Sequence, residues 1–209
     1  MDKKDQAAVV LAGGSSRRMG YDKAFIKLEG VEMLKRIVDL VYSITSEVIV
    51  VIDKEANPDR YRGLVPGDVK IINDLKTGQN PLIGVYSGLS IVSNKYALLI
   101  PCDVPFLNRG IIQLIFERSD GHQAAVPRWP DGRIEPLMSV YRAHEGFNLV
   151  QKLVGKRSSS MNDFVDSFAD IAFVEIESLR HLDNSLLTFS NVNTPEDLRK
   201  MELVTGESL

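Results

Sequence analysis

The sequence predicts an α/β protein with a Rossmann-like, mostly parallel, twisted sheet and helices on both of its faces. Three observations support this fold. Short apolar runs rich in β-branched residues recur along the chain, as expected of strands that are buried on both sides. Segments of helical periodicity separate several of these runs, and that alternation is typical of parallel sheets. The two most unusual loops each follow directly after an apolar run, where open α/β sheets bind ligands.

The first half of the chain contains most of the regular pattern. Apolar runs predict strands at residues 7–11, 48–52, 69–72, 96–100 and 123–126. Helical spacing predicts helices at residues 33–44, 82–92 and 109–116. Pro81 suits the first turn of the second helix and Asn108 can cap the third. Residues 24–28 are expected to form a short extended segment, and residues 53–62, interrupted by Pro58, a polar loop.

The second half is less regular. Strands are expected at residues 137–141, 171–176 and 189–192, and helices at residues 143–153 and 161–168. Thr194 and Pro195 are typical of a helix start, which predicts a last helix running to about Leu203. Neither a repeat nor a low-complexity linker interrupts the chain. We therefore expect one domain over residues 1–209, with a nucleotide-binding part at about 6–126 and an acceptor-substrate part at about 127–203.

Composition restricts the classes of function. The chain has 209 residues, a formal net charge of −3 and a pI of about 5.7, whereas nucleic-acid binders usually carry a basic excess. Cys102 is its single cysteine, so no disulfide can form within the chain. The charged residues 1–5 do not resemble a signal peptide, and no apolar run approaches the length of a membrane span. A soluble, cytoplasmic protein with neither nucleic-acid nor membrane partners is expected.

The loop after the first apolar run has the composition of an anion-binding loop. Gly13 and Gly14 come first, and two serines, two arginines and Lys23 follow within ten residues. Successive backbone N–H groups can form a concave anion site, and the cations would add charge-assisted hydrogen bonds. The spacing fits neither the P-loop nor the dinucleotide fingerprint. The alternative is a polar turn with solvated charges.

The stretch from Leu11 to Lys23, with the sequence Leu-Ala-Gly-Gly-Ser-Ser-Arg-Arg-Met-Gly-Tyr-Asp-Lys, resembles the signature loop of the molybdenum cofactor guanylyltransferase family of nucleotidyltransferases. The resemblance implies a fold of the nucleotide-diphospho-sugar transferase type and a loop that wraps a nucleotide triphosphate. The Ala-Gly-Gly form is typical of guanylyl enzymes, whereas cytidylyl relatives tend to have Ala-Ala-Gly. It implies nucleotide contacts from Leu11, Ala12, Gly13, Gly14 and Lys23, and catalytic roles for Arg18 and Lys23.

The second unusual loop places Asp103 between Pro101 and Pro105. Both prolines restrict the backbone, and a rigid carboxylate beside phosphates is a typical Mg²⁺ ligand. Alternatively, the side chain caps its own turn. The segment resembles the family's second motif, whose aspartate binds the metal, which implies catalytic, nucleotide-binding and metal-binding roles for Asp103. Cys102 is expected to be a small strand-end residue rather than a nucleophile.

Two further polar residues are candidates for substrate contact. Asp74 follows the third predicted strand and is either a solvated turn residue or, as the resemblance implies, a contact to the guanine base. Asn193 belongs to a segment that resembles a C-terminal motif of the family, which implies help with the metal or the second substrate. The family often has an asparagine after its second strand, but here Asp53 follows Val51 and Ile52.

Two other features have weaker interpretations. Gly84 and Gly88 lie four residues apart on the predicted helix over residues 82–92, which suits either a nucleotide or tight packing on the sheet. Arg128, Trp129 and Arg133 lie on the loop expected to face the acceptor, although solvated loop residues are the alternative.

The activity that the resemblance implies is transfer of GMP from GTP to molybdopterin or its molybdenum form, with Mg²⁺ as cofactor and pyrophosphate as product. The acceptor phosphate is already a nucleophile, so no general base is expected. Proteins that deliver the cofactor to molybdoenzymes are further candidate partners. The alternatives are a cytidylyl- or sugar-phosphate nucleotidyltransferase and a non-catalytic carrier of a nucleotide or pterin.

Overall fold

In the computed structural model, which describes residues 2–13, 22–78, 80–156, 159–193 and 197, seven of the described strands form one sheet with the order β5-β4-β1-β6-β8-β7-β9. β8 runs antiparallel to both of its neighbours, and every other neighbouring pair is parallel. The predicted α/β fold with a mostly parallel sheet is therefore confirmed. The strands are β1 (Gln6–Leu11), β4 (Glu47–Ile52), β5 (Lys70–Asn73), β6 (Tyr96–Pro101), β7 (Ala124–Arg128), β8 (Ser139–Arg142) and β9 (Ile171–Glu175).

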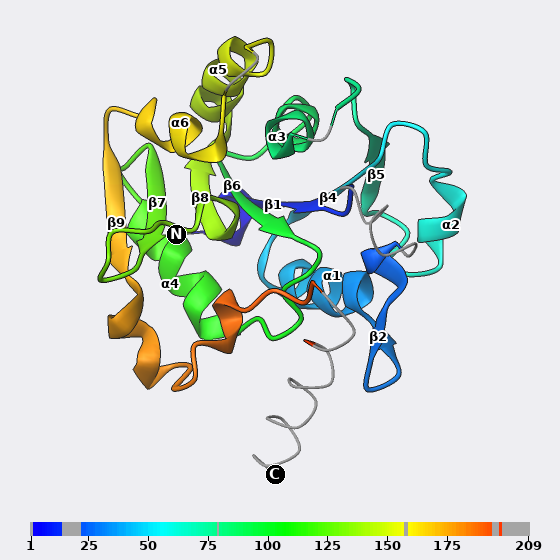
Figure 1. Cartoon of the computed structure of the whole chain (residues 1–209), viewed down its shortest axis with the longest axis horizontal. Coiled ribbons are helices and arrows are strands. Elements are labelled where there is room, and N and C mark those ends of the chain that lie inside the picture. Colours follow the sequence, from blue (N-terminus) through cyan, green and yellow to red (C-terminus); the bar gives the residue numbers. More distant parts are fainter. Residues whose placement is uncertain (1, 14–21, 79, 157–158, 194–196, 198–209) are drawn as a thin grey trace.

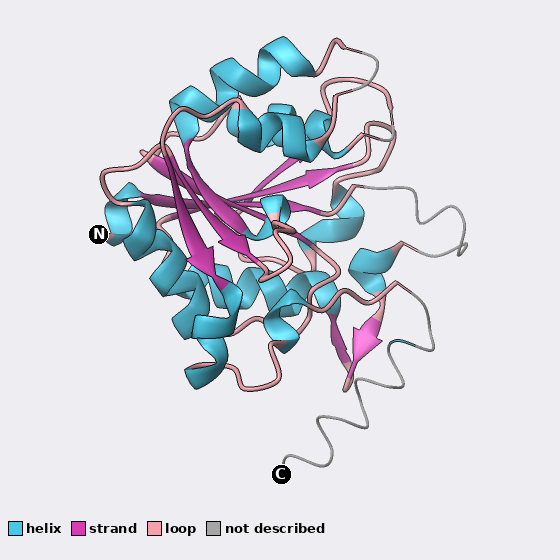
Figure 2. Cartoon of the chain, turned by 60° about the vertical axis from the view of Figure 1, so that its left-hand side comes forward, coloured by secondary structure: helices cyan, strands magenta, loops and turns pink. Residues whose placement is uncertain are grey.

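Helices cover both faces of this sheet, as Figures 1 and 2 show. α1 (Met33–Ile44) and α4 (Arg109–Ser119) lie on one face, and α3 (Pro81–Leu89), α5 (Ala143–Leu153) and α6 (Met161–Asp166) lie on the other. Successive strand residues point to opposite faces, so Val10 of β1 packs with the α1 side and Val9 with the α3 side. Burial on both faces explains why these strands are continuous apolar runs.

Helix ends follow the local chemistry of the sequence. The side chain of Asn108 accepts a hydrogen bond from the Ile111 N–H at the start of α4, as predicted, and Asn80 caps α3 in the same way in front of Pro81. Ser160 and Asp163 form a capping box at the start of α6. The predicted bounds of α1 and α5 agree with the structure, whereas α3 ends at Leu89 rather than at residue 92.

Several expectations for the irregular segments were wrong. The expected loop at residues 53–62 contains the short helix α2 (Asp59–Arg62). Residues 24–28 divide into a 3₁₀ helix, η3 (Lys23–Phe25), and β2 (Lys27–Leu28), which pairs with β3 (Val31–Glu32). Further 3₁₀ helices are η1 (Lys3–Asp5), η4 (Pro136–Met138), η5 (Ile176–His181) and η6 (Leu187–Phe189).

The strand expected at residues 189–192 is absent. Phe189 ends η6, and residues 190–192 follow without regular structure, although Val192 is only 1% exposed. A short apolar run predicts burial but does not distinguish a strand from a buried irregular segment. The start of the helix expected after residue 193 lies outside the described residues. Among the residues that are described, no helix has the length and apolar character needed to cross a membrane.

The carboxyl ends of β1, β4, β5 and β6 lie at one edge of the sheet. Beyond the strands the backbone pairing continues: the N–H groups of Ala12 and Gly13 donate to the Val51 carbonyl, and the Cys102 N–H donates to the Leu11 carbonyl at 3.0 Å. The start of the glycine loop at Ala12 and Gly13 and the start of the loop around Asp103 at Cys102 therefore lie side by side, as the sequence predicted. β1 lies between β4 and β6, and the order of the strands reverses between β1 and β6. Open α/β sheets bind their ligands at such a reversal.

Gly88 shows how closely α3 approaches the sheet. A Cβ atom at this position would lie 2.2 Å from Cγ1 of Val9 and 3.2 Å from Cγ2 of Val51. The packing explanation for Gly88 is therefore sufficient.

Replacing Gly88 with alanine should destabilise the fold, because the added methyl group would force α3 away from β1. We expect a loss of about 1–3 kcal/mol in the free energy of unfolding, measured by urea denaturation. Gly63 is the matched control, because a Cβ there would meet nothing within 4 Å and its φ is −70°. Gly63→Ala should leave stability unchanged or raise it slightly. Equal effects of the two substitutions would contradict the packing argument.

Candidate active site

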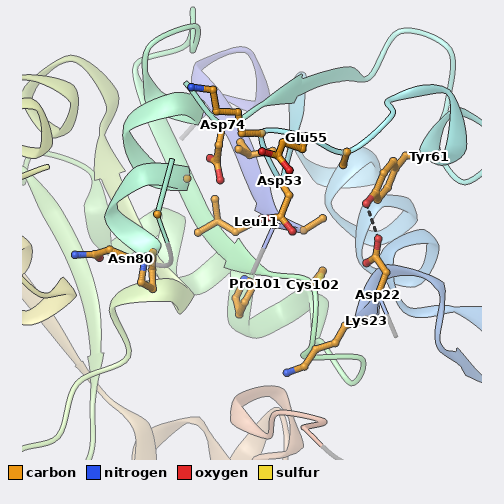
Figure 3. A pocket seen from close by; sticks show the side chains of 18 of the residues that line it. Leu11, Asp22, Lys23, Asp53, Glu55, Tyr61, Asp74, Asn80, Pro101 and Cys102 are labelled. Carbon is orange, nitrogen blue, oxygen red and sulfur yellow. Dashed lines mark hydrogen bonds between the residues drawn. The ribbon is translucent and has the colours of Figure 1, made fainter. Parts of the chain in front are cut away.

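A cavity of about 730 Å³ opens at the carboxyl edge of the sheet. Residues that follow four different strands line it, and Figure 3 shows most of their side chains. Asp53, Glu55 and Asp74 lie close together in one part of the cavity, and Lys23 lies in another with Leu11 between them. The cavity thus has an acidic end and an end with a lysine. Of the predicted nucleotide contacts, it is lined by Leu11, Ala12, Gly13, Lys23, Asp74 and Asp103.

Gly13 allows two backbone segments to pass close to each other. A Cβ atom at Gly13 would lie 2.9 Å from the backbone nitrogen of Asp53, just beyond β4. A larger residue would displace the backbone from the sheet edge, so the fold itself requires glycine here. The predicted contacts Gly14 and Arg18 lie outside the described residues.

Lys23 contacts two other predicted site residues. Its Nζ donates to Oδ2 of Asp103 at 2.8 Å and to Oδ1 of Asn193 at 2.7 Å, although these residues are 80 and 170 positions away. The Lys23 and Asp103 side chains are 19% and 17% exposed. The C-terminal segment is also held by its backbone, because the Val192 N–H donates to the Asp103 carbonyl at 2.8 Å.

Asp103 retains one carboxylate oxygen for a ligand. Its Oδ1 is buried and has no hydrogen-bond partner among the described residues. An unpaired buried carboxylate oxygen is costly. The Asp103 side chain that carries it lines the cavity, and Lys23 links the other oxygen of this carboxylate to the amide oxygen of Asn193. Oxygen donors of this kind suit Mg²⁺. Within the described part of the chain no group of three or more His, Cys, Asp or Glu residues could hold a metal, so the remaining ligands would come from substrate and water.

Asp74 is the second acid with an unpaired oxygen. Its backbone N–H extends the sheet by donating to the Ile52 carbonyl, and its Oδ1 is buried without a partner among the described residues. Burial, and to a smaller extent the negative charge of Asp53, raise the pKa of Asp74 to about 6, although a hydrogen bond with Ser87 acts in the opposite direction. The unpaired Oδ1 of this carboxylate can accept a hydrogen bond from a bound ligand.

The loop after β4 was not predicted to form part of the site. Asp53, Lys54 and Glu55 all line the cavity, and Asp53 follows the strand where the resemblance suggested an asparagine. The side-chain N–H groups of Asn73 hold this loop, donating to the backbone carbonyls of Asp53, Lys54 and Ala56 at 2.8–3.2 Å. The position directly after a buried strand was the only signal in the sequence.

Comparison with known proteins identifies the family. Residues 8–181 match the model of the MobA-like NTP transferase domain. The chain belongs to the MobA-like NTP transferase family. A Methanosarcina acetivorans protein with the name "probable molybdenum cofactor guanylyltransferase" is 34% identical over 211 residues, which cover 95% of this chain and 90% of the relative. A protein of the same name from Methanothermobacter thermautotrophicus is 34% identical over 203 residues, covering 95% of this chain and all of the relative.

Solved structures show the same fold. Molybdopterin-guanine dinucleotide biosynthesis protein A from Archaeoglobus fulgidus superposes with a TM-score of 0.79 at 22% identity, covering 96% of this chain and 99% of the other. The 2-C-methyl-D-erythritol 4-phosphate cytidylyltransferase from Thermus thermophilus has a TM-score of 0.68 at 20% identity and covers 95% of this chain and 98% of its own. This MobA-like protein therefore has the nucleotide-diphospho-sugar transferase fold and is a nucleotidyltransferase.

Other candidate residues have partners of their own in the MobA-like fold. Arg128 pairs with Glu175, Trp129 donates to Glu135, and Arg133 pairs with Asp131; none of the three lines the cavity. The Cys102 side chain is buried, and burial raises the pKa of its thiol far above the usual range, as expected of a structural residue.

The raised pKa of Asp74 predicts a pH-dependent stability. A carboxyl whose folded-state pKa lies above its unfolded value binds more protons when folded, so its contribution to the free energy of unfolding falls as pH rises from about 4 to about 7. The substitution Asp74→Asn removes the titrating carboxyl, so the variant does not lose this free energy of unfolding as the pH rises. The variant should exceed the wild type by about 1–2 kcal/mol at pH 7, after allowance for partial solvation.

The measurement is urea unfolding of both proteins at several pH values. The difference between them should vanish below about pH 3, where the wild-type carboxyl is protonated in both states. A difference that does not change with pH would show that Asp74 keeps an ordinary pKa.

Proposed function

We propose that this MobA-like protein transfers GMP from GTP to the terminal phosphate of molybdopterin or its molybdenum form, releasing pyrophosphate. The observation that carries the proposal is the contact of Lys23 with both Asp103 and Asn193 in the cavity that also contains Asp74. Its parts suit a nucleoside triphosphate, because a lysine and the start of the glycine loop lie at one end and the unpaired Oδ1 of Asp74 lies at the other. The names of the similar proteins indicate guanine and molybdopterin as substrates.

The two ends of the cavity suggest how GTP binds. Guanine presents two adjacent donors, N1–H and the 2-amino group, which match the acceptor oxygens of Asp74. Asp53 lies nearby and would add a second acceptor at the base. The triphosphate would then extend past Leu11 to the N–H groups of the glycine loop, where Lys23 and Arg18 supply positive charge.

Asp103 and Asn193 are the residues that would hold Mg²⁺, through the unpaired Oδ1 of the aspartate and the amide oxygen of the asparagine. When bound, the ion would neutralise charge on the phosphates. Two carboxylate or amide oxygens plus phosphate and water oxygens are a usual Mg²⁺ environment.

The chain's own groups would act mainly by positioning and by charge. An oxygen of the acceptor phosphate attacks the α-phosphorus of GTP in line, a new P–O bond forms, and the bond to the departing pyrophosphate breaks. Because the acceptor is already an anion, no side chain needs to remove a proton. Lys23 would stabilise negative charge on the triphosphate as that bond breaks.

We also propose that residues from about 127 onward contribute mainly to the acceptor side, within one domain. Leu137 is the described residue of this part that lines the cavity, and β7, β8 and β9 extend the sheet that carries the nucleotide site.

The activity can be tested directly by incubating the protein with molybdopterin, Mg²⁺ and each of GTP, CTP and ATP, and measuring product mass. A product of molybdopterin plus GMP, with release of pyrophosphate, is expected from GTP. A CMP product would make the protein a cytidylyl enzyme, and binding without turnover would make it a carrier.

Replacing Asp74 with alanine should weaken GTP binding selectively, because the guanine donors lose their acceptor. A hydrogen bond to a charged group contributes about 1.5–3 kcal/mol, so calorimetry should show roughly a tenfold or larger increase in Kd for GTP. Binding of inorganic tripolyphosphate should be little changed. Equal affinities of the wild type for GTP and CTP would contradict this role.

Replacing Asp103 with asparagine should reduce turnover far more than GTP binding, because the charge that would hold the metal is lost while the shape is kept. We expect a fall in kcat on the order of 100-fold, partly reversed at high Mg²⁺, measured as pyrophosphate release. Asp39→Asn, on the exposed side of α1, is the matched control. A folded Asp103→Asn protein with full turnover would remove Asp103 from the site.

A further inference from the structure

We propose that Tyr61 is a positioning residue that directs Lys23 into the active site through Asp22. The proposal rests on the proposed function in one respect, the binding of the triphosphate by Lys23. The contacts that carry the proposal begin at Tyr61 in α2, a helix for which no functional role was predicted, and end at Lys23, the last residue of the glycine loop.

The first step is a buried hydrogen bond. Tyr61 is only 2% exposed, and its hydroxyl donates to Oδ2 of Asp22 at 2.5 Å, drawn as a dashed line in Figure 3. Burial raises the pKa of the Tyr61 hydroxyl well above its usual range, and the carboxylate of Asp22 raises it further. The hydroxyl therefore keeps its proton at neutral pH and acts as a constant donor to Asp22.

The second step fixes the backbone on both sides of Lys23. The other oxygen of Asp22, Oδ1, accepts from the Ala24 N–H at 3.1 Å and so caps η3. The Asp22 carbonyl accepts from Phe25, and the Lys23 carbonyl accepts from Ile26. Both oxygens of Asp22 are thus occupied, one by η3 and one by Tyr61.

The third step is a ring contact on the far side of Lys23. The rings of Phe25 and Tyr61 lie 5.0 Å apart, and the guanidinium of Arg60 lies 4.9 Å from the centre of the Phe25 ring. α2 therefore contacts the residue before Lys23 and the second residue after it. A lysine held between two anchored neighbours has fewer directions available to its side chain.

The arrangement also keeps a competing charge away from Lys23. In Figure 3 the carboxylate of Asp22 points towards Tyr61, whereas the Lys23 side chain points away from both. The ammonium group is therefore left to Asp103 and Asn193. Without the hydroxyl, the adjacent carboxylate would lose a strong donor and could pair with Lys23 or repel a triphosphate.

The test uses Tyr61→Phe, which keeps the ring and removes the hydroxyl. Tyr42→Phe is the matched control, because the Tyr42 hydroxyl donates to Asp68 at 3.0 Å and neither residue lines the active-site cavity. Circular dichroism and urea unfolding report whether each variant folds. If Tyr61→Phe does not fold, Asp22→Ala removes the same hydrogen bond from its other side and is tested in its place.

The first readout needs no nucleotide. Brief treatment with acetic anhydride, followed by mass spectrometry, measures how fast the Lys23 amine reacts relative to the amine of Lys35 on α1. Loosening of the Lys23–Asp103 pair should raise the relative rate about threefold in Tyr61→Phe, the effect of losing a modest ion pair, and should leave it unchanged in Tyr42→Phe. An unchanged rate in Tyr61→Phe would overturn the proposal.

The second readout is a double-mutant cycle on the affinity for GTP with Mg²⁺. Tyr61→Phe should raise Kd about fivefold when Lys23 is present, but less than about twofold in the Lys23→Met background, because a residue that acts through Lys23 has no effect once Lys23 is gone. Equal losses in both backgrounds would overturn the proposal. If the wild type binds no nucleotide, the proposed function fails, and the acetylation rates still decide the role of Tyr61.

Discussion

The contact between Lys23 and Asp103 is the interaction on which the rest of the site depends. It joins the loop after β1 to the loop after β6, and the shared contact with Asn193 adds the C-terminal segment. These loops meet because their strands are adjacent and parallel, with Leu11 beside Pro101 in register. The sheet thus places a cation, a carboxylate and an amide oxygen at one point, although the chain separates them widely.

Charge is distributed unevenly along the cavity. Asp53, Glu55 and Asp74 gather at one end, where burial and then the charge of Asp53 raise the pKa of Asp74. At the other end, the ammonium of Lys23 compensates Asp103. A ligand that is a hydrogen-bond donor at one end and an anion at the other fits this distribution in a single orientation.

The sequence predicted the sheet and the main loops because their signals are local. Continuous apolar runs indicate strands buried on two faces, and Asn108 or Pro81 indicates where a helix begins. Residues 189–192 were misassigned because burial alone does not reveal pairing between strands. Asp53 and Tyr61 were missed because each has its partner at a distant position in the sequence: Asp53 lies beside Gly13, and Tyr61 contacts Asp22. No periodicity records such contacts.

The hydrogen bond from the Val192 N–H to the Asp103 carbonyl has a consequence for the order in which the site is completed. During synthesis Lys23 and Asp103 emerge long before Asn193, so their pair can form while the ammonium still lacks its third partner. The last contact can form only after residue 193 has been made. The final arrangement of the lysine thus depends on a segment synthesised 170 residues after it, and the growing chain carries an incomplete centre until then.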